Sequence, residues 1–400
     1  MTATAIALDV AAAENRLMRY LEIEGITGQE KKIGEAIAAD LKAIGVPASA
    51  IRFDDANSRI TPPTETGNLI VDLPGTKPGP RLMFATHLDT VPLCAGAKPK
   101  RDGDRIVSDG TTALGGDNRT GCAVLVTLAE TLLKNKLPHP PITLLFTVRE
   151  ESGLHGAREL RAADLGKPTM CFNVDGGIPS DLIIGAVGQE NWQVEIKGKA
   201  AHAGVAPEKG ISSTLVASIA IAEAHRDGWF GKVAKTDGKG TSNVGIFGGK
   251  PGQPAGDATN VVTDYVSIKG EARSPEAPFA TKIAGAYKEA FARAQAAVKD
   301  VDGATAEVKF EHSPAYPPFH LDENSPAVSR ATKAAESLGL KPNYVFSNGG
   351  LDANWLDKHG IPTVTIGAGQ REIHTIKEYV ELPEFATGCK FAIALATIDA

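Results

Sequence analysis

The stretch MFATHLDTV, residues 83–91, runs from an apolar segment into a histidine and an aspartate before it returns to valine. The segment Arg81–Ala85 has the length and composition of a buried strand, so His87 and Asp89 fall where that strand should end. Side chains two residues apart on a strand point to the same side. A polar strand end would account for the pair, and so would a histidine ligand whose ring is oriented by the neighbouring carboxylate.

Around this stretch, helix and strand patterns alternate along the chain. Apolar residues spaced three and four apart predict helices at Ala11–Leu21, Lys31–Ile44 and Gly121–Leu133. Short apolar runs predict strands at Asn68–Leu73, Arg81–Ala85, Ile142–Val148 and Met170–Val174. This alternation predicts an α/β fold with a mostly parallel sheet and helices on both faces.

A different pattern occupies residues 189–312, where the predicted order is β-α-β-β-α-β. That order is typical of a small, self-contained α+β unit. We therefore expect an inserted domain at 189–312, with residues 1–188 and 313–400 forming one larger domain. Three prolines indicate a hinge region next to the insertion: Pro314, Pro317 and Pro318.

Bulk composition argues against several classes of protein. Lys and Arg total 42 against 48 Asp and Glu, and the formal net charge is −6, so no overall positive field attracts nucleic acid. The four cysteines show no paired spacing and are expected to be thiols in a reducing compartment: Cys94, Cys122, Cys171 and Cys389. The N-terminal segment contains Asp9 and Glu14 and resembles neither a leader nor a membrane span. We expect a cytoplasmic protein that binds neither nucleic acid nor membranes.

Ligand-type side chains recur after other strand patterns. Asp117, in GGDNRTG, lies at the start of a predicted helix, where an aspartate could also act as a cap. Glu150 and Glu151, in TVREESG, follow an apolar run and project in opposite directions, although a solvated loop would also place them there. Asp175 ends the run in FNVDGG, and His374, in REIHT, follows the strand pattern IPTVTIG. Each position has an ordinary explanation, but together they need a common cause.

In an open α/β sheet, the carboxyl ends of parallel strands converge on one crevice, so distant residues can meet there. Two imidazoles and three carboxylates are a donor set typical of zinc and similar divalent ions: His87, Asp117, Glu151, Asp175 and His374. Two ions that share one carboxylate would use the whole set and leave a position for a bridging water. Asp89 would then orient His87, and Glu150 would be free to act as a general base on that water. The chemistry implied is hydrolysis of an amide.

Short motifs in this order resemble those of peptidase T-like members of the co-catalytic zinc metallopeptidase family, which also contains aminoacylases and glutamate carboxypeptidases. They extend from about Gly67 to Val380 and are HLDTV, GGDNRTG, EESG, VDGG, KAAHAGVAPEKG, ATNVV, GEARS, GGLDAN and HT. No single string is specific, but their combination is. The family commonly has Asp-Asp-Lys where this chain has Asp117-Asn118-Arg119, a departure that retains the ligand.

The resemblance implies a division of the ligands between two zinc ions, for which Co²⁺ or Mn²⁺ can substitute. One ion is bound by His87 and Asp175, the other by Glu151 and His374, and both by Asp117. Glu150 is the implied general base. Related structures have a cis peptide bond after the bridging aspartate, so we predict one between Asp117 and Asn118.

The resemblance also implies that the larger domain is catalytic and that the inserted domain is a lid that binds substrate and can form a homodimer. His202, in KAAHAG, is similar to a lid histidine that polarises the scissile carbonyl. Arg273, in GEARS, is similar to a residue that binds a substrate carboxylate, for which a guanidinium is well suited. Asn260, in ATNVV, is expected to hydrogen-bond near the same point, and the alternative for it is a turn residue.

The expected function is therefore that of a di-zinc aminopeptidase that hydrolyses short peptides, tripeptides in particular. A deacylase or carboxypeptidase acting on N-acyl amino acids would use the same metal site. A binding protein that retains the fold without catalysis is a third interpretation, against which the presence of Glu150 argues. The sequence contains no Gly-x-Ser-x-Gly elbow, phosphate-binding P-loop or His-Glu-x-x-His helix, so it does not indicate those enzyme classes.

Overall fold

A computed structural model describes residues 8–399 of the chain. These residues form two compact units: one combines the chain up to Ala186 with the chain from Phe319 onward, and the other is Val187–Pro318. The second unit extends beyond the expected limits of 189 and 312 because its strands β9 (Gly188–Lys197) and β13 (Glu307–Tyr316) do so. Residues 1–7, part of the segment in which we expected no leader or membrane span, lie outside the described range.

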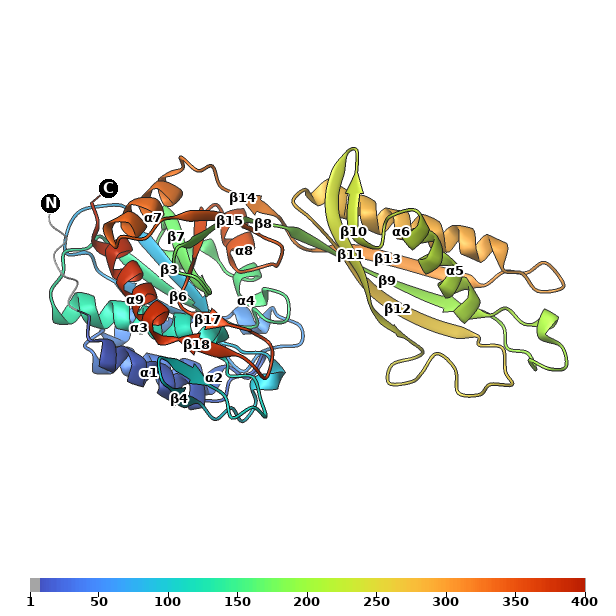
Figure 1. The fold of residues 1–400 in the computed structure, drawn as a ribbon, viewed down its shortest axis with the longest axis horizontal. Helices are drawn as coiled ribbons and strands as arrows, with labels where there is room; N and C mark the ends of the chain where they lie inside the picture. The colour runs from blue at the N-terminus through green and yellow to red at the C-terminus, as the bar shows by residue number, and fades with distance from the viewer. Residues whose placement is uncertain (1–7, 400) are drawn as a thin grey trace. The chain divides into compact units, whose positions relative to one another are not determined.

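The first unit is built on a sheet that contains nine strands within the described residues. Its order is β1 (Ile51–Phe53), β2 (Leu69–Leu73), β6 (Ile142–Thr147), β3 (Leu82–His87), β7 (Met170–Gly176), β16 (Thr363–Gly367), β8 (Asp181–Ala186) and β14 (Phe319–His320), with β15 (Asn343–Ser347) paired to β8. Strands β6, β3, β7 and β16 run parallel to one another, whereas β1, β2 and β14 pair in antiparallel fashion. The predicted α/β class with a mostly parallel central sheet is confirmed (Figure 1).

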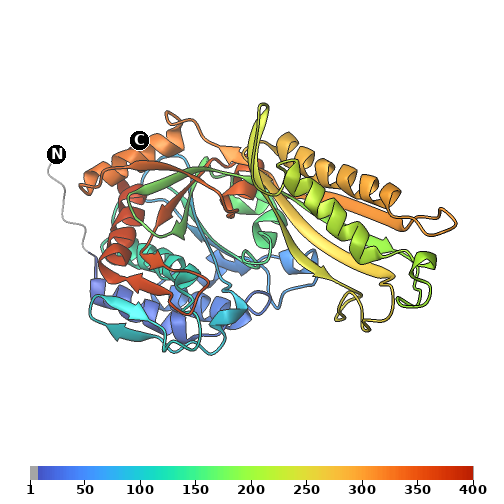
Figure 2. The same cartoon turned by 45° about the vertical axis from the view of Figure 1, so that its right-hand side comes forward.

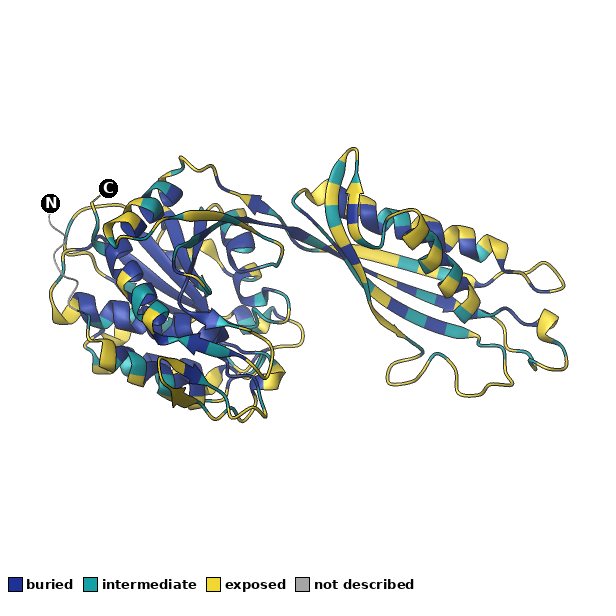
Figure 3. Cartoon of the chain, viewed as in Figure 1, coloured by how far each residue is buried: buried dark blue, intermediate teal, exposed yellow. Residues whose placement is uncertain are grey.

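Both faces of this sheet are covered, which explains why its central strands are apolar along their whole length (Figure 3). All residues of β3 are buried. Leu82 and Phe84 pack into the larger core cluster, whereas Met83 and Ala85 pack into a second cluster. Because neighbouring residues of a strand project to opposite faces, β3 is packed on both sides up to its last residue, His87.

Helices provide the covering layers of the first unit. They are α1 (Val10–Glu22), α2 (Lys31–Ala43), α3 (Gly116–Lys134), α4 (His155–Arg158), α7 (Pro326–Ser337), α8 (Ala353–Lys358) and α9 (Leu382–Thr397). Helices α1, α2, α3, α7 and α9 contribute to the larger cluster, and α8 contributes Leu356 to the second. Helix α3 begins at Gly116, before the predicted start at Gly121, and two residues in its first turn have non-helical dihedral angles. Among the described residues, no helix combines the length and apolar character needed to cross a membrane.

A separate small sheet in the first unit consists of β17 (Gln370–Arg371), β18 (Tyr379–Glu381), β5 (Arg105–Val107) and β4 (Lys100–Asp102). His374 lies in the connection between β17 and β18. The small sheet, rather than the end of β16 alone, therefore positions this histidine.

The second unit is an antiparallel sheet with the order β10 (Gly231–Lys235), β11 (Gly238–Gly248), β12 (Tyr265–Ser274), β9 and β13. Helices α5 (Ser213–Arg226) and α6 (Ala277–Ala297) lie side by side on one face of it (Figures 1 and 2). The predicted order β-α-β-β-α-β was wrong in one respect, because β10 forms an additional hairpin strand with β11. Only Val233 of its five residues is buried, so the sequence GKVAK carries no alternating apolar pattern.

Gly270, in β12, is a position where any side chain would collide with the core of the second unit. A Cβ atom there would lie 2.1 Å from the ring of Trp192. That ring stacks on Tyr287, with centroids 4.6 Å apart, and on Phe310, at 5.6 Å. Gly270→Ala is therefore expected to lower the free energy of unfolding by about 1–3 kcal/mol. Gly285→Ala, in α6 where no described atom beyond the neighbouring residues and backbone of the helix itself would lie within 4 Å of the new Cβ, should instead raise it by up to about 1 kcal/mol. Chemical denaturation measures the free energy of unfolding of both variants. Equal values for the two variants would contradict the close packing of Trp192 against Gly270.

Candidate metal centre

The five predicted ligands come together at one end of the central sheet. Three of them follow neighbouring parallel strands: His87 is the last residue of β3, Glu151 comes after β6, and Asp175 lies near the end of β7. Asp117 lies at the start of α3, and His374 comes from the small sheet. Distant segments therefore meet where the parallel strands end, as the α/β fold predicts.

Asp117 lies between the two histidines. Its Oδ1 is 3.1 Å from Nε2 of His87, and its Oδ2 is 3.2 Å from Nε2 of His374. The Oδ1 atom of Asp175 is 3.5 Å from the same nitrogen of His87, and Oε2 of Glu151 is 3.0 Å from that of His374. Ligand atoms of His87, Asp117 and Glu151 all lie within 4.8 Å of one another. The structure thus brings all five side chains together.

The protonation of His87 shows that this cluster suits a cation. Its Nδ1 lies 2.9 Å from the main-chain carbonyl oxygen of Asp89 and must carry hydrogen to donate to it. In a neutral ring Nε2 is then an acceptor, yet it faces carboxylate oxygens of Asp117 and Asp175. The Nε2 lone pair and the carboxylate oxygens repel one another unless a proton or a metal cation lies between them. Imidazole nitrogens and carboxylate oxygens are the donors that zinc-like divalent ions take, so the residues fit such a metal.

The pKa values describe the same preference for positive charge. Hydrogen bonds to Asp117 and Glu151 raise the pKa of His374 to about 10. Burial opposes protonation of His87, but Asp175 and the hydrogen bond to Asp117 raise its pKa well above the usual value. Burial likewise opposes ionisation of Asp117, but hydrogen bonds from His374 and His87 hold its pKa below the usual range. Burial raises the pKa of Glu151 to about 7 and also raises that of Asp175, so without a metal the cluster favours the anionic form of Asp117 and the protonated form of both histidines.

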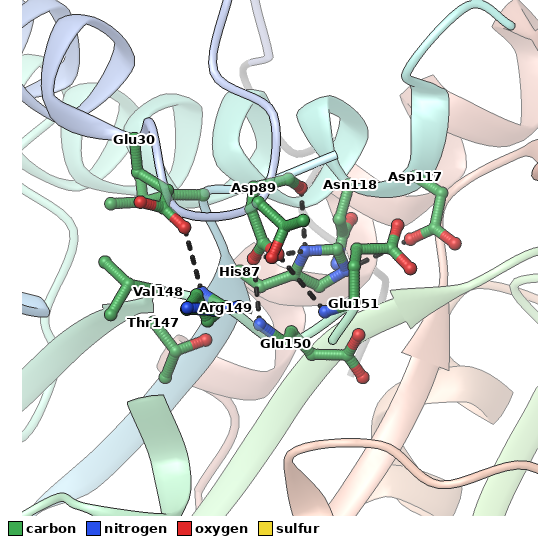
Figure 4. A network of polar contacts seen from close by, with 12 residues as sticks. Glu30, His87, Asp89, Asp117, Asn118, Thr147, Val148, Arg149, Glu150 and Glu151 are labelled. Atoms are coloured by element: carbon green, nitrogen blue, oxygen red, sulfur yellow. Dashed lines mark hydrogen bonds and ion pairs between the residues drawn. The ribbon is translucent and has the colours of Figure 1, made fainter. Parts of the chain in front are cut away.

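The loop after β6 is held by its backbone amides (Figure 4). The amide of Arg149 donates to Oε1 of Glu30 at 3.1 Å. The amides of Glu150 and Glu151 donate to Oδ1 and Oδ2 of Asp89 at 2.9 and 3.2 Å. We expected the Asp89 carboxylate to receive the ring proton of His87; the main-chain carbonyl is the nearer acceptor, at 2.9 Å against 3.5 Å for Oδ1, because the carboxylate is engaged by this loop.

The first turn of α3 contains the predicted cis peptide bond between Asp117 and Asn118, which is confirmed. Asn118 donates from Nδ2 to Oδ1 of Asp175 at 2.9 Å and to the carbonyl of Val174 at 2.7 Å. An aspartate, which the family commonly has at this position, could not make these bonds when ionised. The amide in this chain therefore orients the Asp175 carboxylate.

Glu378 is a buried residue that the sequence patterns did not single out. Its Oε2 accepts hydrogen bonds from the amides of Leu114, at 2.8 Å, and Gly115, at 2.9 Å, and its Oε1 accepts from the amide of Asp117 at 3.0 Å. Glu378 thus fixes the backbone that enters the Asp117 position. Asp352, in the motif GGLDAN, is also buried. It accepts a hydrogen bond from Thr147, and burial raises its pKa to about 7.

The predicted substrate-binding residues all belong to the second unit. The amide of Ala203, next to His202, donates to the carbonyl of Asn260 at 2.8 Å, so these two segments are adjacent. Arg273 lies near the end of β12 and makes paired hydrogen bonds to Glu271 at 3.0 and 2.9 Å. The structure therefore brings His202 and Asn260 together, and it gives Arg273 a carboxylate partner within the chain.

Burial of Glu30 makes stability depend on pH. Burial, together with the charge of Asp89, raises the pKa of Glu30 from 4.5 to about 7. The folded state thus binds this proton more tightly, so the contribution to the free energy of unfolding is largest below about pH 4.5 and is lost as the pH rises to about 7. Glu30→Gln should abolish this part of the change in the free energy of unfolding with pH. Urea denaturation of both metal-free proteins across that range is the measurement, and identical slopes would count against the shift.

An α/β unit with histidines and carboxylates gathered at its strand ends defines a metal-dependent hydrolase. A profile of Peptidase family M20/M25/M40 matches residues 83–397. The chain is 34% identical over 383 residues to the uncharacterized protein YqjE of Bacillus subtilis. The aligned region covers 94% of this chain and 95% of that protein.

Two solved structures are similar over 98% of each chain. Aminopeptidase PepT from Bacillus cereus has 32% identity and a TM-score of 0.83. A tripeptidase from Staphylococcus aureus has 28% identity and a TM-score of 0.86. The chain belongs to peptidase family M20/M25/M40 and is a metal-dependent peptidase, so the resemblance to peptidase T-like enzymes is confirmed.

Proposed function

We propose that this protein is a di-zinc exopeptidase that removes the N-terminal residue from short peptides, tripeptides in particular. The observation that carries the proposal is the position of Asp117, whose two oxygens face two different histidines at 3.1 and 3.2 Å. A carboxylate in that position is suited to being shared by two ions. Similarity to structures described as an aminopeptidase and a tripeptidase supports the choice of substrate.

The ligands divide into two sets around that shared carboxylate. One ion would be held by His87 and Asp175, the other by Glu151 and His374, and both by Asp117. When bound, the ions would polarise the scissile carbonyl and promote ionisation of water. Asp89 and Glu378 hold the backbone on which these ligands depend.

Glu150 is the proposed general base. Its neighbour Glu151 faces His374 at 3.0 Å and is a proposed ligand, which leaves Glu150 to serve a different partner. Burial and nearby carboxylates raise the pKa of Glu150 well above the usual value, which lets it hold a proton between two steps. The carboxylate would take a proton from the attacking water and deliver it to the nitrogen of the leaving amine.

Steady-state rates on three substrate classes test this proposal. The purified protein would be assayed with zinc, cobalt or manganese on free tripeptides, on dipeptides and on N-acetyl amino acids. We expect the highest kcat/KM on tripeptides with a free amino group and little on tripeptides whose amino group is acetylated. Hydrolysis confined to N-acetyl amino acids would replace the proposal with the deacylase alternative, and binding without hydrolysis of any class would favour the non-catalytic one.

We also propose that His202, Asn260 and Arg273 bind the substrate. The adjacency of the His202 and Asn260 segments supports a shared role, and the Arg273 guanidinium already pairs with a carboxylate in the geometry that a peptide C-terminus would offer. Arg273→Lys should therefore raise KM for tripeptides more than it lowers kcat, because a lysine cannot form the paired contact. An unchanged KM would show that Arg273 does not bind the substrate.

The proposed setting is a reducing compartment such as the cytoplasm, with a homodimer formed through the second unit. The four cysteines are buried free thiols, in keeping with such a compartment. Exposed apolar side chains in the second unit, among them Val205 at 77% and Ile246 at 58% exposure, are the surface that a second copy would cover. A mass measured in solution by light scattering distinguishes monomer from dimer.

A further inference from the structure

Glu30 lies just before α2 and is fully shielded from solvent. Its Oε1 accepts hydrogen bonds from the backbone amides of Gly28, at 2.7 Å, and Arg149, at 3.1 Å. Its Oε2 has no hydrogen-bond partner among the described residues. The side chain does not cap α2, so the helix does not account for a carboxylate in this buried place.

A buried carboxylate with an unpaired oxygen is destabilising, and such groups in folded proteins need a specific explanation. The contact with Arg149 offers one, because it joins the start of α2 to the loop that follows β6. The backbone of Arg149 has a φ of +51°, a left-handed conformation that residues other than glycine rarely adopt. Glu30 supplies the acceptor for the amide of Arg149 in that conformation, and His155 donates from its amide to the Arg149 carbonyl at 3.0 Å.

The amide of Arg149 is the first of three consecutive amides that carboxylates hold. Asp89 accepts from the next two, those of Glu150 and Glu151 (Figure 4). Each peptide unit is planar and rigid, so an acceptor on its amide fixes the orientation of the whole unit. Asp89 holds the two units that flank the Cα of Glu150, and Glu30 holds the unit before Arg149, so Glu30 fixes the backbone through which the chain enters the Glu150 position. Glu30 and Asp89 come from different segments, so removing either one would release one side of the loop.

We propose that Glu30 is a positioning residue, whose buried carboxylate oxygen fixes the backbone at Arg149 and thereby aims the side chain of Glu150. This inference rests on the proposed function, in which Glu150 is the general base. Glu30 does not touch the substrate or the metals; it acts through the loop. This role requires an acceptor oxygen as far from the backbone as that of a glutamate side chain, so that it reaches the Arg149 amide. It does not require the negative charge.

Two variants separate reach from charge. Glu30→Gln keeps an acceptor at the same distance and loses the charge, whereas Glu30→Asp keeps the charge and withdraws the acceptor by one methylene. Glu35→Ala removes an exposed carboxylate from α2 and is the matched control. Each protein would be assayed for kcat and KM on a tripeptide, for metal content, and for amide hydrogen exchange at residues 149–151 in the metal-free form.

We expect Glu30→Asp to lower kcat by about 10- to 100-fold with little change in KM, a range typical of residues that support a ligand shell. Its Arg149 amide should exchange about tenfold faster or more, while its metal content stays at the wild-type value. Glu30→Gln and Glu35→Ala should match the wild type in both readouts. The reverse order, with Gln impaired and Asp intact, would overturn the inference, as would unchanged exchange in Glu30→Asp.

The exchange measurement keeps this inference separate from the proposed function. If the wild type hydrolysed no peptide, the proposed function would fail, yet exchange at Arg149 would still show whether Glu30 holds the loop. If the wild type were active and Glu30→Asp equalled it in kcat and exchange, only the inference would fail.

Discussion

Replacing Glu150 with alanine is expected to lower kcat by about 10³- to 10⁴-fold while two metal ions remain bound. The size of the loss follows from the role of a general base, which contributes up to about 10⁴-fold to a hydrolytic rate. The metal content should persist because the five ligand side chains, and the amides that hold their loops, are untouched. Steady-state kinetics and elemental analysis of the same protein sample provide the measurement.

The neighbouring residue is the matched control for this experiment. Glu151→Ala removes a carboxylate whose Oε2 lies 3.0 Å from Nε2 of His374, so it should lose metal as well as turnover. Two adjacent glutamates would then fail for different reasons, one with the metals in place and one without them. If Glu150→Ala lost metal, or kept turnover within about tenfold of the wild type, Glu150 would not be the base.

Asp117→Ala should have the second large effect. Asp117 faces both His87 and His374, so its loss would remove a proposed ligand from each ion and leave the two histidines without this common anion. We expect fewer than two ions per chain and a kcat/KM lowered at least about 10³-fold. Equilibrium dialysis against zinc and tripeptide assays measure these effects.

The fold should survive this change, because Glu378 accepts from the amide of residue 117, not from its side chain. A far-ultraviolet circular dichroism spectrum and a thermal unfolding curve check this point. Asp102→Ala, an exposed position on β4, is the control and should bind two ions with wild-type kinetics. An Asp117 variant that bound two ions with unchanged affinity would show that the carboxylate is not shared.

Four of the candidate metal ligands could be predicted to lie together because each has a local signature in the sequence. His87, Glu151 and Asp175 follow apolar runs that are recognisable as buried strands, and parallel strands bring their carboxyl ends to one edge. Asp117 combines a glycine-rich turn with the start of a helix. These signals depend on residues close in sequence, and the structure gathers the side chains as expected.

The supporting residues could not be predicted in the same way. Glu30 and Glu378 are glutamates beside ordinary polar neighbours, and only the packing of remote segments makes them buried acceptors for amides 119 and 261 residues away in the chain. Helix α9 was missed for a related reason. It is buried on nearly all sides, so its sequence LPEFATGCKFAIALAT lacks the contrast between apolar and polar faces that marks a surface helix.

The most direct test of the central claim is reconstitution of the metal-free protein. A strong chelator would be used to strip the protein, and activity on a tripeptide would be followed as zinc is added back stepwise. We predict that turnover is lost on stripping, returns with added zinc, and reaches its plateau at two equivalents per chain. Turnover that survives complete removal of metal, or that reaches its plateau at one equivalent, would contradict a site in which Asp117 is shared by two ions.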